Sequence, residues 1–251
     1  MIRRPPRSTR KESSAASDVY KRQAFKDKKI ISEIGFVVNS GDIYGLLGPN
    51  GAGKTTTFYI IAGLLSSDKG QIILSDEDIS DLPMHQRSKR GIKYLPQEPS
   101  IFQNLSVYEN LYGLAEISFN NKNDIDIFID NCMEEFNLSK IADLKVRQLS
   151  GGQRRKFEIA RTLAADPKII LLDEPFAGID PIAIEDIKSV LTKLLKRNIG
   201  ILITDHNVRE TLEICNKAAI ISDGKIIAEG NKESLISNEM VKKVYLGTMY
   251  K

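Results

Sequence analysis

GPNGAGKT at residues 48–55 is the stretch of sequence that decides the fold. It follows an apolar run at 43–47, which predicts a strand, and it precedes an apolar-periodic stretch at 58–65, which predicts a helix. A glycine-rich loop that joins a strand to a helix and ends in Lys-Thr is the P-loop pattern in the context that it requires. The alternative is a bare glycine-rich turn before a helix, and the flanking strand disfavours it. The stretch therefore predicts a nucleotide-phosphate site.

The residue types of this loop fit phosphate chemistry. Glycines let consecutive backbone N–H groups turn toward phosphate oxygens, and the helix that follows adds its positive N-terminal end. Lys54 would supply a charge to the β- and γ-phosphates, Thr55 a hydroxyl to Mg²⁺, and Thr56 a contact to the α-phosphate. The residues expected to bind nucleotide here are Gly48, Pro49, Asn50, Gly51, Ala52, Gly53, Lys54, Thr55 and Thr56.

A second part of the site is predicted at residues 169–174, IILLDE. Continuous apolarity is typical of a buried central strand, and the strand ends in two acids. Asp173 would accept from a metal-bound water or from Thr55, and Glu174 would polarise the attacking water beyond the γ-phosphate. The alternative is two acids that merely begin a loop.

The stretch LSGGQ at residues 149–153 begins a helix, because Ser150 and Gln153 form an S-x-x-Q capping box. A cap does not need Gly151 and Gly152, each of which weakens a helix by about 1 kcal/mol. Their presence predicts a close approach of the backbone, and an anion at the helix N-terminus is the expected neighbour.

Charge and composition exclude several classes of protein. The net charge is +3, but residues 1–23 alone contribute +5, which leaves −2 for residues 24–251 and no nucleic-acid footprint in the folded part. No run of 18 apolar residues predicts a membrane span. Cys132 and Cys215 have no second Cys or His at ligand spacing, so neither a disulfide framework nor a metal site is expected.

Residues 1–23 are expected to be a non-native or disordered leader, with a transit peptide as the alternative. From residue 24 on, strands alternate with helices, which predicts an α/β fold with a parallel sheet. The expected strands are 30–38, 43–47, 71–74, 92–95, 169–172 and 199–203, and a hairpin at 218–228 turns at Asp223-Gly224. Residues 99–148 are mainly helical, and further helices are expected at 151–165, 181–197, 207–217 and 232–245.

With these motifs in this order, the sequence resembles the ATP-binding cassette family. The P-loop, Gln97, LSGGQ, the acidic strand and His206 cover nearly all of residues 24–251. The resemblance implies a P-loop NTPase (RecA-like) core with an antiparallel β subdomain and an inserted helical subdomain. It divides the chain into a core at 24–97 and 149–230, the helical subdomain at 98–148 and a C-terminal helix at 231–251.

The resemblance also implies residue roles. Gln97 contacts Mg²⁺ or the attacking water, His206 contacts the γ-phosphate, Asp180 lies in a loop that crosses a dimer interface, and Phe25 stacks on adenine. The implied assembly is a head-to-tail homodimer in which the P-loop of one chain and Ser150–Gln153 of the other enclose each ATP. Magnesium would be held by Thr55, Gln97 and Asp173, and Glu174, His206, Gln97 and Lys54 would carry the hydrolysis.

Within the family, the resemblance is closest to the ATPases of bacterial lipopolysaccharide export, on the stretches 45–59, 173–182, 202–212 and 241–247. It implies a peripheral ATPase at the cytoplasmic face of the inner membrane, bound to separate transmembrane permease subunits. A groove between Gln97 and Ser106, with Phe102 as an apolar contact, would hold a short helix of those subunits.

Two alternatives stay open at this stage: the ATPase of a branched-chain amino acid importer, and a non-transport cassette protein of DNA repair or translation. A binding module without turnover is disfavoured because Lys54 and Glu174 are both present. The sequence departs from the family at its start, since relatives have a further strand before the aromatic residue and residues 1–23 are not expected to form one.

Overall fold

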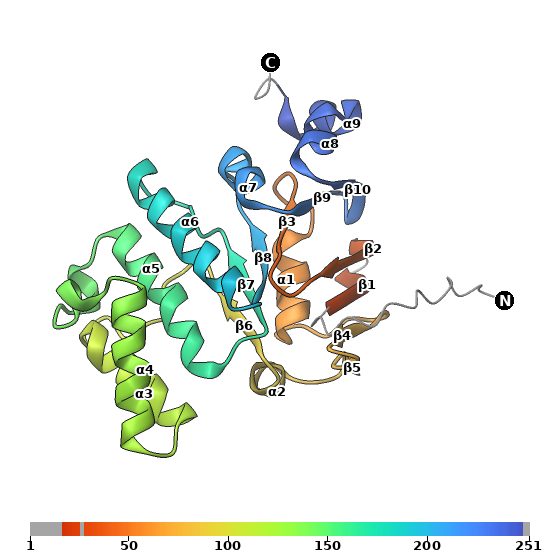
Figure 1. Ribbon diagram of the computed structural model, residues 1–251. Coiled ribbons are helices and arrows are strands. Elements are labelled where there is room, and N and C mark those ends of the chain that lie inside the picture. The colour runs from red at the N-terminus through yellow and green to blue at the C-terminus, as the bar shows by residue number, and fades with distance from the viewer. Residues whose placement is uncertain (1–16, 26–27, 248–251) are drawn as a thin grey trace.

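The structure is a computed structural model that describes residues 17–25 and 28–247. In that part of the chain, ten strands form one curved sheet in the order β5-β4-β1-β2-β10-β9-β3-β8-β7-β6 (Figure 1). The strands are β1 (Ser17–Phe25), β2 (Lys28–Val38), β3 (Ile43–Leu47), β4 (Ile72–Leu74), β5 (Glu77–Asp78), β6 (Ile92–Leu95), β7 (Ile169–Asp173), β8 (Gly200–Thr204), β9 (Lys217–Ser222) and β10 (Lys225–Gly230).

The centre of the sheet is parallel, as the alternation of strands and helices predicts. Strand β3 pairs with β8 and with β9, and β7 pairs with β8 and with β6, in each case in parallel. All five residues of β3, β7 and β8 are buried, which explains their continuous apolar runs. The carboxyl ends of β3, β7 and β8 therefore meet at one edge of the sheet.

The expected hairpin is confirmed. Strands β9 and β10 pair antiparallel around Asp223 and Gly224, whose φ angles are 47° and 72°. Two consecutive positive φ angles are what a tight type I′ hairpin turn requires, and Asp-Gly is a preferred pair for it.

The antiparallel subdomain differs from the prediction at its start. Ser17–Phe25 form strand β1, which pairs antiparallel with β2 and with β4. The expectation that residues 1–23 contain no strand is therefore wrong for residues 17–23. The sequence pattern does not predict the strand because backbone pairing on both sides supplies its hydrogen bonds, whatever the side chains are.

The helices cover both faces of the sheet. Their bounds are α1 (Lys54–Ala62), α2 (Met84–Lys89), α3 (Val107–Ser118), α4 (Lys122–Glu135), α5 (Gly151–Arg161), α6 (Pro181–Lys196), α7 (Val208–Ile214), α8 (Lys232–Ser237) and α9 (Glu239–Val241). Short 3₁₀ turns occupy Ser139–Ile141, Val146–Gln148 and Thr162–Ala165, and a π turn occupies Lys242–Leu246.

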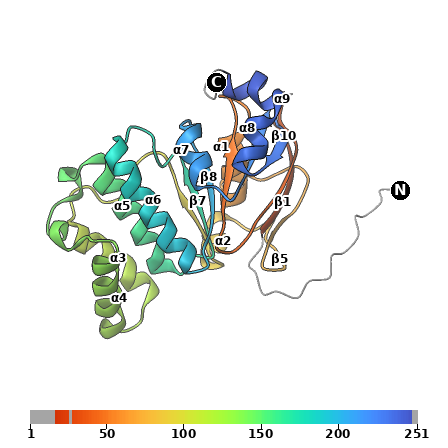
Figure 2. The ribbon, with the colours of Figure 1, turned by 45° about the horizontal axis from the view of Figure 1, so that its top comes forward.

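Alternate residues of β7 divide the core in two. Ile170 and Leu172 pack with buried residues of α3, α4, α5 and α6, whereas Ile169 and Leu171 pack with buried residues of α1. Successive side chains of a strand point to opposite faces, so the sheet lies between the α1 layer and the α5–α6 layer. Figure 2 shows α5 and α6 together on one side of the sheet, with α3 and α4 beyond them.

The helical segment between β6 and α5 begins where the sequence predicts. Ser106 caps α3, because its hydroxyl accepts from the Glu109 N–H at 3.0 Å while the Glu109 carboxylate accepts from the Ser106 N–H at 2.7 Å. Val107, Leu111 and Ala115 on α3 are fully buried and belong to the same core cluster as α5 and α6. The segment is therefore joined to the sheet domain through one continuous apolar core.

The expected closing helix at 232–245 is wrong as one unit. It is broken at Asn238 into α8, α9 and the π turn. The Asn238 side chain accepts from the backbone N–H groups of Met240 and Val241 at 2.9 and 3.2 Å, and its own backbone is extended. A side chain that takes over backbone donors in this way ends one helix and begins another.

No helix in the described ranges is long and apolar enough to cross a bilayer.

Two isoleucines on α6 test the assignment of its buried face. Ile187 is fully buried in the core cluster, whereas Ile182 on the same helix is 83% exposed. We expect Ile187→Ala to lower the free energy of unfolding by about 2–5 kcal/mol, because it leaves a cavity. The matched change Ile182→Ala should stay within about 0.5 kcal/mol. Urea unfolding of both variants measures the difference, and equal losses would contradict the packing described here.

Candidate functional site

The P-loop lies between β3 and α1 and has the backbone that its glycines allow. Gly48, Gly51 and Gly53 have φ angles of 151°, 79° and 107°. A Cβ at Gly48 would lie 2.1 Å from the Ile221 carbonyl oxygen, so the loop passes directly over β9. No side chain caps α1, whose N-cap residue is Gly53. The first N–H groups of α1 therefore remain for a phosphate.

Lys54 is held inside this loop. Its Nζ donates to the carbonyl oxygens of Gly48 and Pro49 at 2.7 and 3.0 Å, and the residue is 7% exposed. Burial lowers the pKa of the Lys54 ammonium, and the nearby carboxylates of Glu174 and Asp173 oppose that shift. Thr55 is exposed at the first turn of α1. The loop thus places a buried cation and a free hydroxyl at the helix start, as the sequence predicts.

Asp173 ends β7 and is buried at the same edge of the sheet. One carboxylate oxygen accepts from the Thr204 hydroxyl at 2.7 Å, and the other accepts from the Tyr94 hydroxyl at 3.2 Å. Burial, together with Asp173, raises the pKa of Tyr94, so Tyr94 stays protonated and continues to donate. These donors come from β8 and β6, the two strands that flank β7.

Glu174 and His206 are in direct contact, although 32 positions separate them in the sequence. The Glu174 Oε1 and His206 Nε2 atoms are 2.5 Å apart, and the side chains are 13% and 52% exposed. Burial raises the pKa of the Glu174 carboxyl, and His206 opposes that rise. Glu174 also has a positive φ of 48°, which directs it away from the strand. A carboxylate of raised pKa at the mouth of a phosphate loop has the properties of a general base.

Asp205 is a site residue that sequence reasoning missed. It is 1% exposed, and its two carboxylate oxygens accept from the backbone N–H groups of Phe176 and Asn207 at 2.8 and 2.7 Å. Burial raises the pKa of Asp205, while these hydrogen bonds oppose the rise. Asp205 therefore ties the loop that carries Glu174 to the loop that carries His206. Its position next to His206 was the available signal.

Arg155 on α5 was also missed. Its guanidinium donates to the Pro96 carbonyl at 2.8 Å, to the Asp173 carbonyl at 2.9 Å and to the Glu158 carboxylate at 3.0 Å. The residue is 6% exposed. It joins the ends of β6 and β7 to α5. Gln97, which follows Pro96, is exposed at this edge of the sheet.

The LSGGQ stretch forms the expected capping box at the start of α5. The Ser150 hydroxyl accepts from the Gln153 N–H at 3.2 Å, and the Gln153 side chain accepts from the Ser150 N–H at 3.0 Å. The expected close approach is present at Gly152, where a Cβ would lie 2.3 Å from Ala183 Cβ on α6. The neighbour found in this chain is a helix, so packing by itself requires Gly152. Whether an anion also approaches this segment stays a prediction.

The structure brings some of the predicted residues together and separates others. The P-loop, Asp173, Glu174 and His206 lie at one edge of the sheet, with Lys54 close enough to the two acids to shift its pKa. Asp180 instead caps α6, where it accepts from the Ala183 N–H at 2.9 Å. Helix α5 lies on the far side of α6 from α1 in both ribbon views (Figures 1 and 2). The Phe25 side chain lies outside the described part of the structure.

The donor set at the P-loop fits a magnesium ion. Hydroxyl, carboxylate and amide oxygens are the ligands that Mg²⁺ prefers, and Thr55, Asp173 and Gln97 supply one of each. In the described ranges no group of three or more His, Cys, Asp or Glu forms a metal cluster. A site with one carboxylate is consistent with an ion that arrives together with a phosphate ligand.

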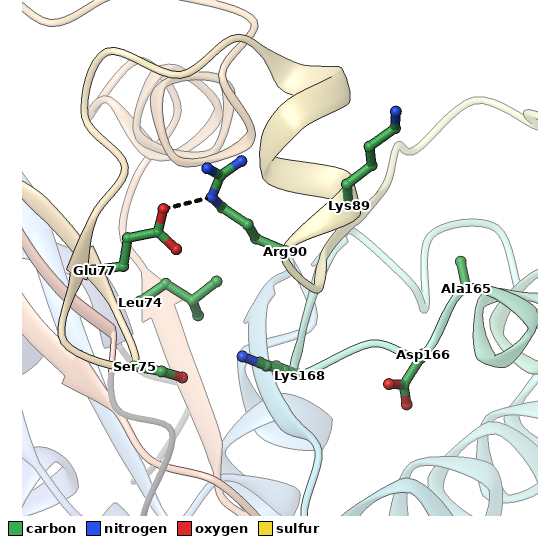
Figure 3. A pocket seen from close by; sticks show the side chains of 8 residues that line it. All are labelled: Leu74, Ser75, Glu77, Lys89, Arg90, Ala165, Asp166 and Lys168. Atoms are coloured by element: carbon green, nitrogen blue, oxygen red, sulfur yellow. Dashed lines mark hydrogen bonds and ion pairs between the residues drawn. The ribbon is translucent and has the colours of Figure 1, made fainter.

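A small cavity of about 260 Å³ lies away from this edge. Figure 3 shows the Lys168 and Arg90 side chains directed toward it, with Arg90 bound to Glu77 at 2.6 Å. Lys168 precedes β7, so this cavity is at the amino end of the parallel strands. Nucleotide sites of α/β sheets lie at the carboxyl ends, and this cavity is not assigned to the nucleotide.

A larger cleft of about 1130 Å³ lies between α2, β6, α3, α4 and the turn Thr162–Ala165. Leu114, Ile117, Phe119 and Phe128 form part of its apolar wall. Phe102 is 70% exposed and does not line it, so this cleft is distinct from the groove expected at 97–106, which stays a prediction.

With this geometry in view, comparison with known proteins decides the family. The model of the ABC transporter family matches residues 31–177. This chain belongs to that family.

Relatives and solved structures agree with the assignment. The ABC chain is 55% identical to the lipopolysaccharide export system ATP-binding protein LptB of Haemophilus influenzae over 91% of this chain and 95% of the relative. It is 52% identical to LptB of Escherichia coli K12 over 90% and 94%. A crystal structure of the ADP conformation of an ABC transporter cassette matches with a TM-score of 0.82 at 29% identity, over 93% of this chain and 99% of that one. The cassette fold and the ATPase class predicted from the sequence are confirmed.

Gly152 in α5 and Gly113 in α3 of this ABC chain give a matched test of the α5–α6 contact. Gly152→Ala should lower the free energy of unfolding by about 1–3 kcal/mol, because the new methyl meets Ala183. Gly113 in α3 has open space around it, so Gly113→Ala should raise stability by up to about 1 kcal/mol. Urea unfolding measures both. A Gly152→Ala protein as stable as Gly113→Ala would show that packing does not require this glycine.

Proposed function

We propose that this chain is the ATP-hydrolysing subunit of a lipopolysaccharide exporter, acting at the cytoplasmic face of the bacterial inner membrane. The observation that carries the proposal is its identity to two proteins named for lipopolysaccharide export, over nine-tenths of its length. The contact between Glu174 and His206 beside an intact P-loop supports hydrolysis rather than binding alone.

ATP binding follows from the loop geometry. The backbone N–H groups of residues 48 and 50–56 would surround the phosphates, and Lys54 would exchange its contacts with Gly48 and Pro49 for the β- and γ-phosphates. Thr55, Asp173 and Gln97 would hold Mg²⁺, which supplies charge neutralisation for the transferring phosphoryl group when it is bound. Phe25 is proposed to stack on adenine, since stacking needs only a ring face.

Glu174, which follows β7, and His206, which lies just beyond β8, are proposed to carry out hydrolysis. Glu174 accepts a proton from the attacking water, a role that its burial favours because burial raises its pKa. His206 would hold the Glu174 carboxylate through the 2.5 Å contact and is proposed to contact the γ-phosphate. Asp205 holds both loops by their backbones, so neither side chain has to be ordered during the reaction.

The complete site is proposed to need two chains, arranged head to tail. Ser150–Gln153 begin a helix whose capping box leaves the Gly151 and Gly152 N–H groups for a phosphate, yet α5 and α1 lie on opposite faces of the sheet within one chain. A second copy would bring its α5 to this P-loop. The exposed loop before Asp180 would lie in the same interface.

Membrane subunits are proposed to dock in the 1130 Å³ cleft. The transport that names the relatives needs a membrane-spanning partner, and the described helices include no candidate span. The cleft is the size of a ligand groove and has an apolar wall at Ile117 and Phe128, which fits one face of a short amphipathic helix.

Glu174→Gln is the test of the hydrolytic mechanism. We expect a loss of turnover of at least roughly a hundredfold, because the amide cannot accept the proton, while ATP affinity stays within about twofold. The variant should also accumulate as an ATP-bound dimer in size-exclusion chromatography. Steady-state phosphate release and equilibrium ATP binding measure the two quantities.

Two further variants of this chain serve as controls for Glu174→Gln. Glu116→Gln, an exposed change on α3, should leave turnover as it is. Lys54→Ala should lose ATP affinity itself, because the phosphates lose their charged partner. Wild-type turnover in Glu174→Gln would remove Glu174 from the proposed role.

Ile117→Glu tests the docking cleft. Ile117 is 83% exposed and lines the cleft, so a carboxylate there should prevent an apolar helix face from binding. We expect the variant to lose co-purification with the membrane subunits. Ile127→Glu is the matched control, because Ile127 is 60% exposed on α4 but does not line the cleft. Loss of the complex in both variants, or in neither, would count against the cleft.

A further inference from the structure

Lys188 on α6 lies among three glutamates. Its Nζ contacts the carboxylates of Glu185 at 2.8 Å, Glu213 at 3.2 Å and Glu210 at a shorter distance. Glu185 belongs to α6 itself, whereas Glu210 and Glu213 belong to α7. One lysine therefore bridges two helices that lie side by side (Figures 1 and 2).

The Lys188 side chain is largely buried, whereas its glutamate partners are more exposed. The Lys188 side chain is 13% exposed, and its α7 partners are 25% and 35% exposed, whereas Glu185 is 70% exposed. Burial alone would lower the pKa of Lys188, but the three carboxylates reverse that effect and raise it. The ammonium is thus charged at every ordinary pH. Ion pairs of this partly buried, multi-partner kind are more effective than isolated surface pairs.

The two helices that Lys188 joins, α6 and α7, begin just after the loops that carry Glu174 and His206. Helix α6 begins at Pro181, after the loop that carries Glu174, and α7 begins at Val208, two residues after His206. Glu210 is in the first turn of α7. A rotation of α7 about its axis or away from α6 would therefore move His206 directly.

The apolar cores do not fix this first turn of α7 to α6. The buried Val208 and Leu212 of α7 pack with Leu47 and the C-terminal segment, while Ile184 and Ile187 of α6 pack in the other core cluster. Near its start, α7 is joined to α6 through the Lys188 carboxylate contacts. The contacts of Lys188 therefore fix the orientation of the first turn of α7 relative to α6, which apolar packing does not fix.

We propose that Lys188 is a positioning residue for ATP hydrolysis: it holds α7 against α6 so that His206 stays in contact with Glu174. The inference rests on the proposed function, because it concerns the geometry of the same reaction. It differs from a purely stabilising role, since the bridge controls the 2.5 Å contact between His206 and Glu174. Lys188 does not reach the nucleotide loop itself.

Lys188→Met is the primary variant, since it keeps the length of the side chain and removes the charge. We expect kcat for ATP to fall by roughly tenfold to a hundredfold, the scale of a small misplacement at a reacting group, with KM and ATP affinity within about twofold. Lys188→Arg keeps the charge and should restore most of kcat. The full chain is assayed well below the melting temperature measured for each variant, so that unfolding does not enter the rate.

Variants of the three glutamates test which partners of Lys188 affect turnover. Glu210→Gln with Glu213→Gln removes the negative charge from both α7 partners of Lys188 and should lower kcat as Lys188→Met does; it also removes the charge of the exposed Arg209–Glu213 pair. Glu185→Gln is the matched control, because it removes the negative charge of the partner of the same ammonium within α6. We expect Glu185→Gln to keep kcat within about twofold of wild type.

The outcomes distinguish this inference from the proposed function. If Glu174→Gln keeps wild-type turnover, the hydrolytic mechanism fails whatever Lys188 does. If Glu174→Gln is inactive while Lys188→Met keeps kcat, or lowers only the melting temperature, the positioning role is overturned. An equal loss of kcat in Glu185→Gln would also overturn it, because that change leaves the contacts between the helices in place.

Discussion

The hydrogen bond between Asp173 and Thr204 fixes the register on which the rest of the site depends. Asp173 ends β7, Thr204 ends β8, and the two residues are paired in the parallel ladder. A slip of one residue would turn every side chain of either strand to the opposite face. It would move Glu174 and His206 apart and would exchange the side chains that pack on the α1 side with those that pack on the α5–α6 side. Catalytic geometry and core packing are therefore set by one register.

Buried polar groups then hold the loops that extend from this register. Asp205 binds two backbone N–H groups from separate loops, and Arg155 binds the carbonyl groups that end β6 and β7. Such groups are costly to bury without partners, so each one strongly specifies the loop conformation that satisfies it. The result is an edge of the sheet at which the proposed catalytic side chains are held in a fixed orientation, which would lower the entropic cost of reaching the reactive arrangement.

Arg155 also links the strand ends beside the P-loop to the helical segment that contains α3. Its helix, α5, shares an apolar core with α3, and α3 lines the cleft proposed for the membrane subunits. At the same time Arg155 contacts the strand end that carries Asp173 and the segment before Gln97. Helix α5 therefore links the strand ends beside the P-loop to α3, which lines the cleft.

Part of this organisation could be read from local sequence. The P-loop, the strand that ends in Asp173-Glu174, the cap at Ser106 and the Asp223-Gly224 hairpin depend on residues close together in the chain, and each lies where the sequence predicts. One miss is local, the break of the closing helix at Asn238. The others involve distant partners: β1 is formed by pairing on both sides, the neighbour that requires Gly152 is α6, and Arg155 and Asp205 act on loops up to 59 positions away.

The sequence by itself thus determined the fold class, the nucleotide loop and the identity of the acids, because turn geometry, strand apolarity and side-chain chemistry are local properties. Only the tertiary structure decided that Glu174 contacts His206, that Lys188 joins α6 to α7, and that a large apolar cleft lies beside Ile117. Contacts of this kind arise when distant segments pack against the same sheet, and no local pattern encodes the distance between them.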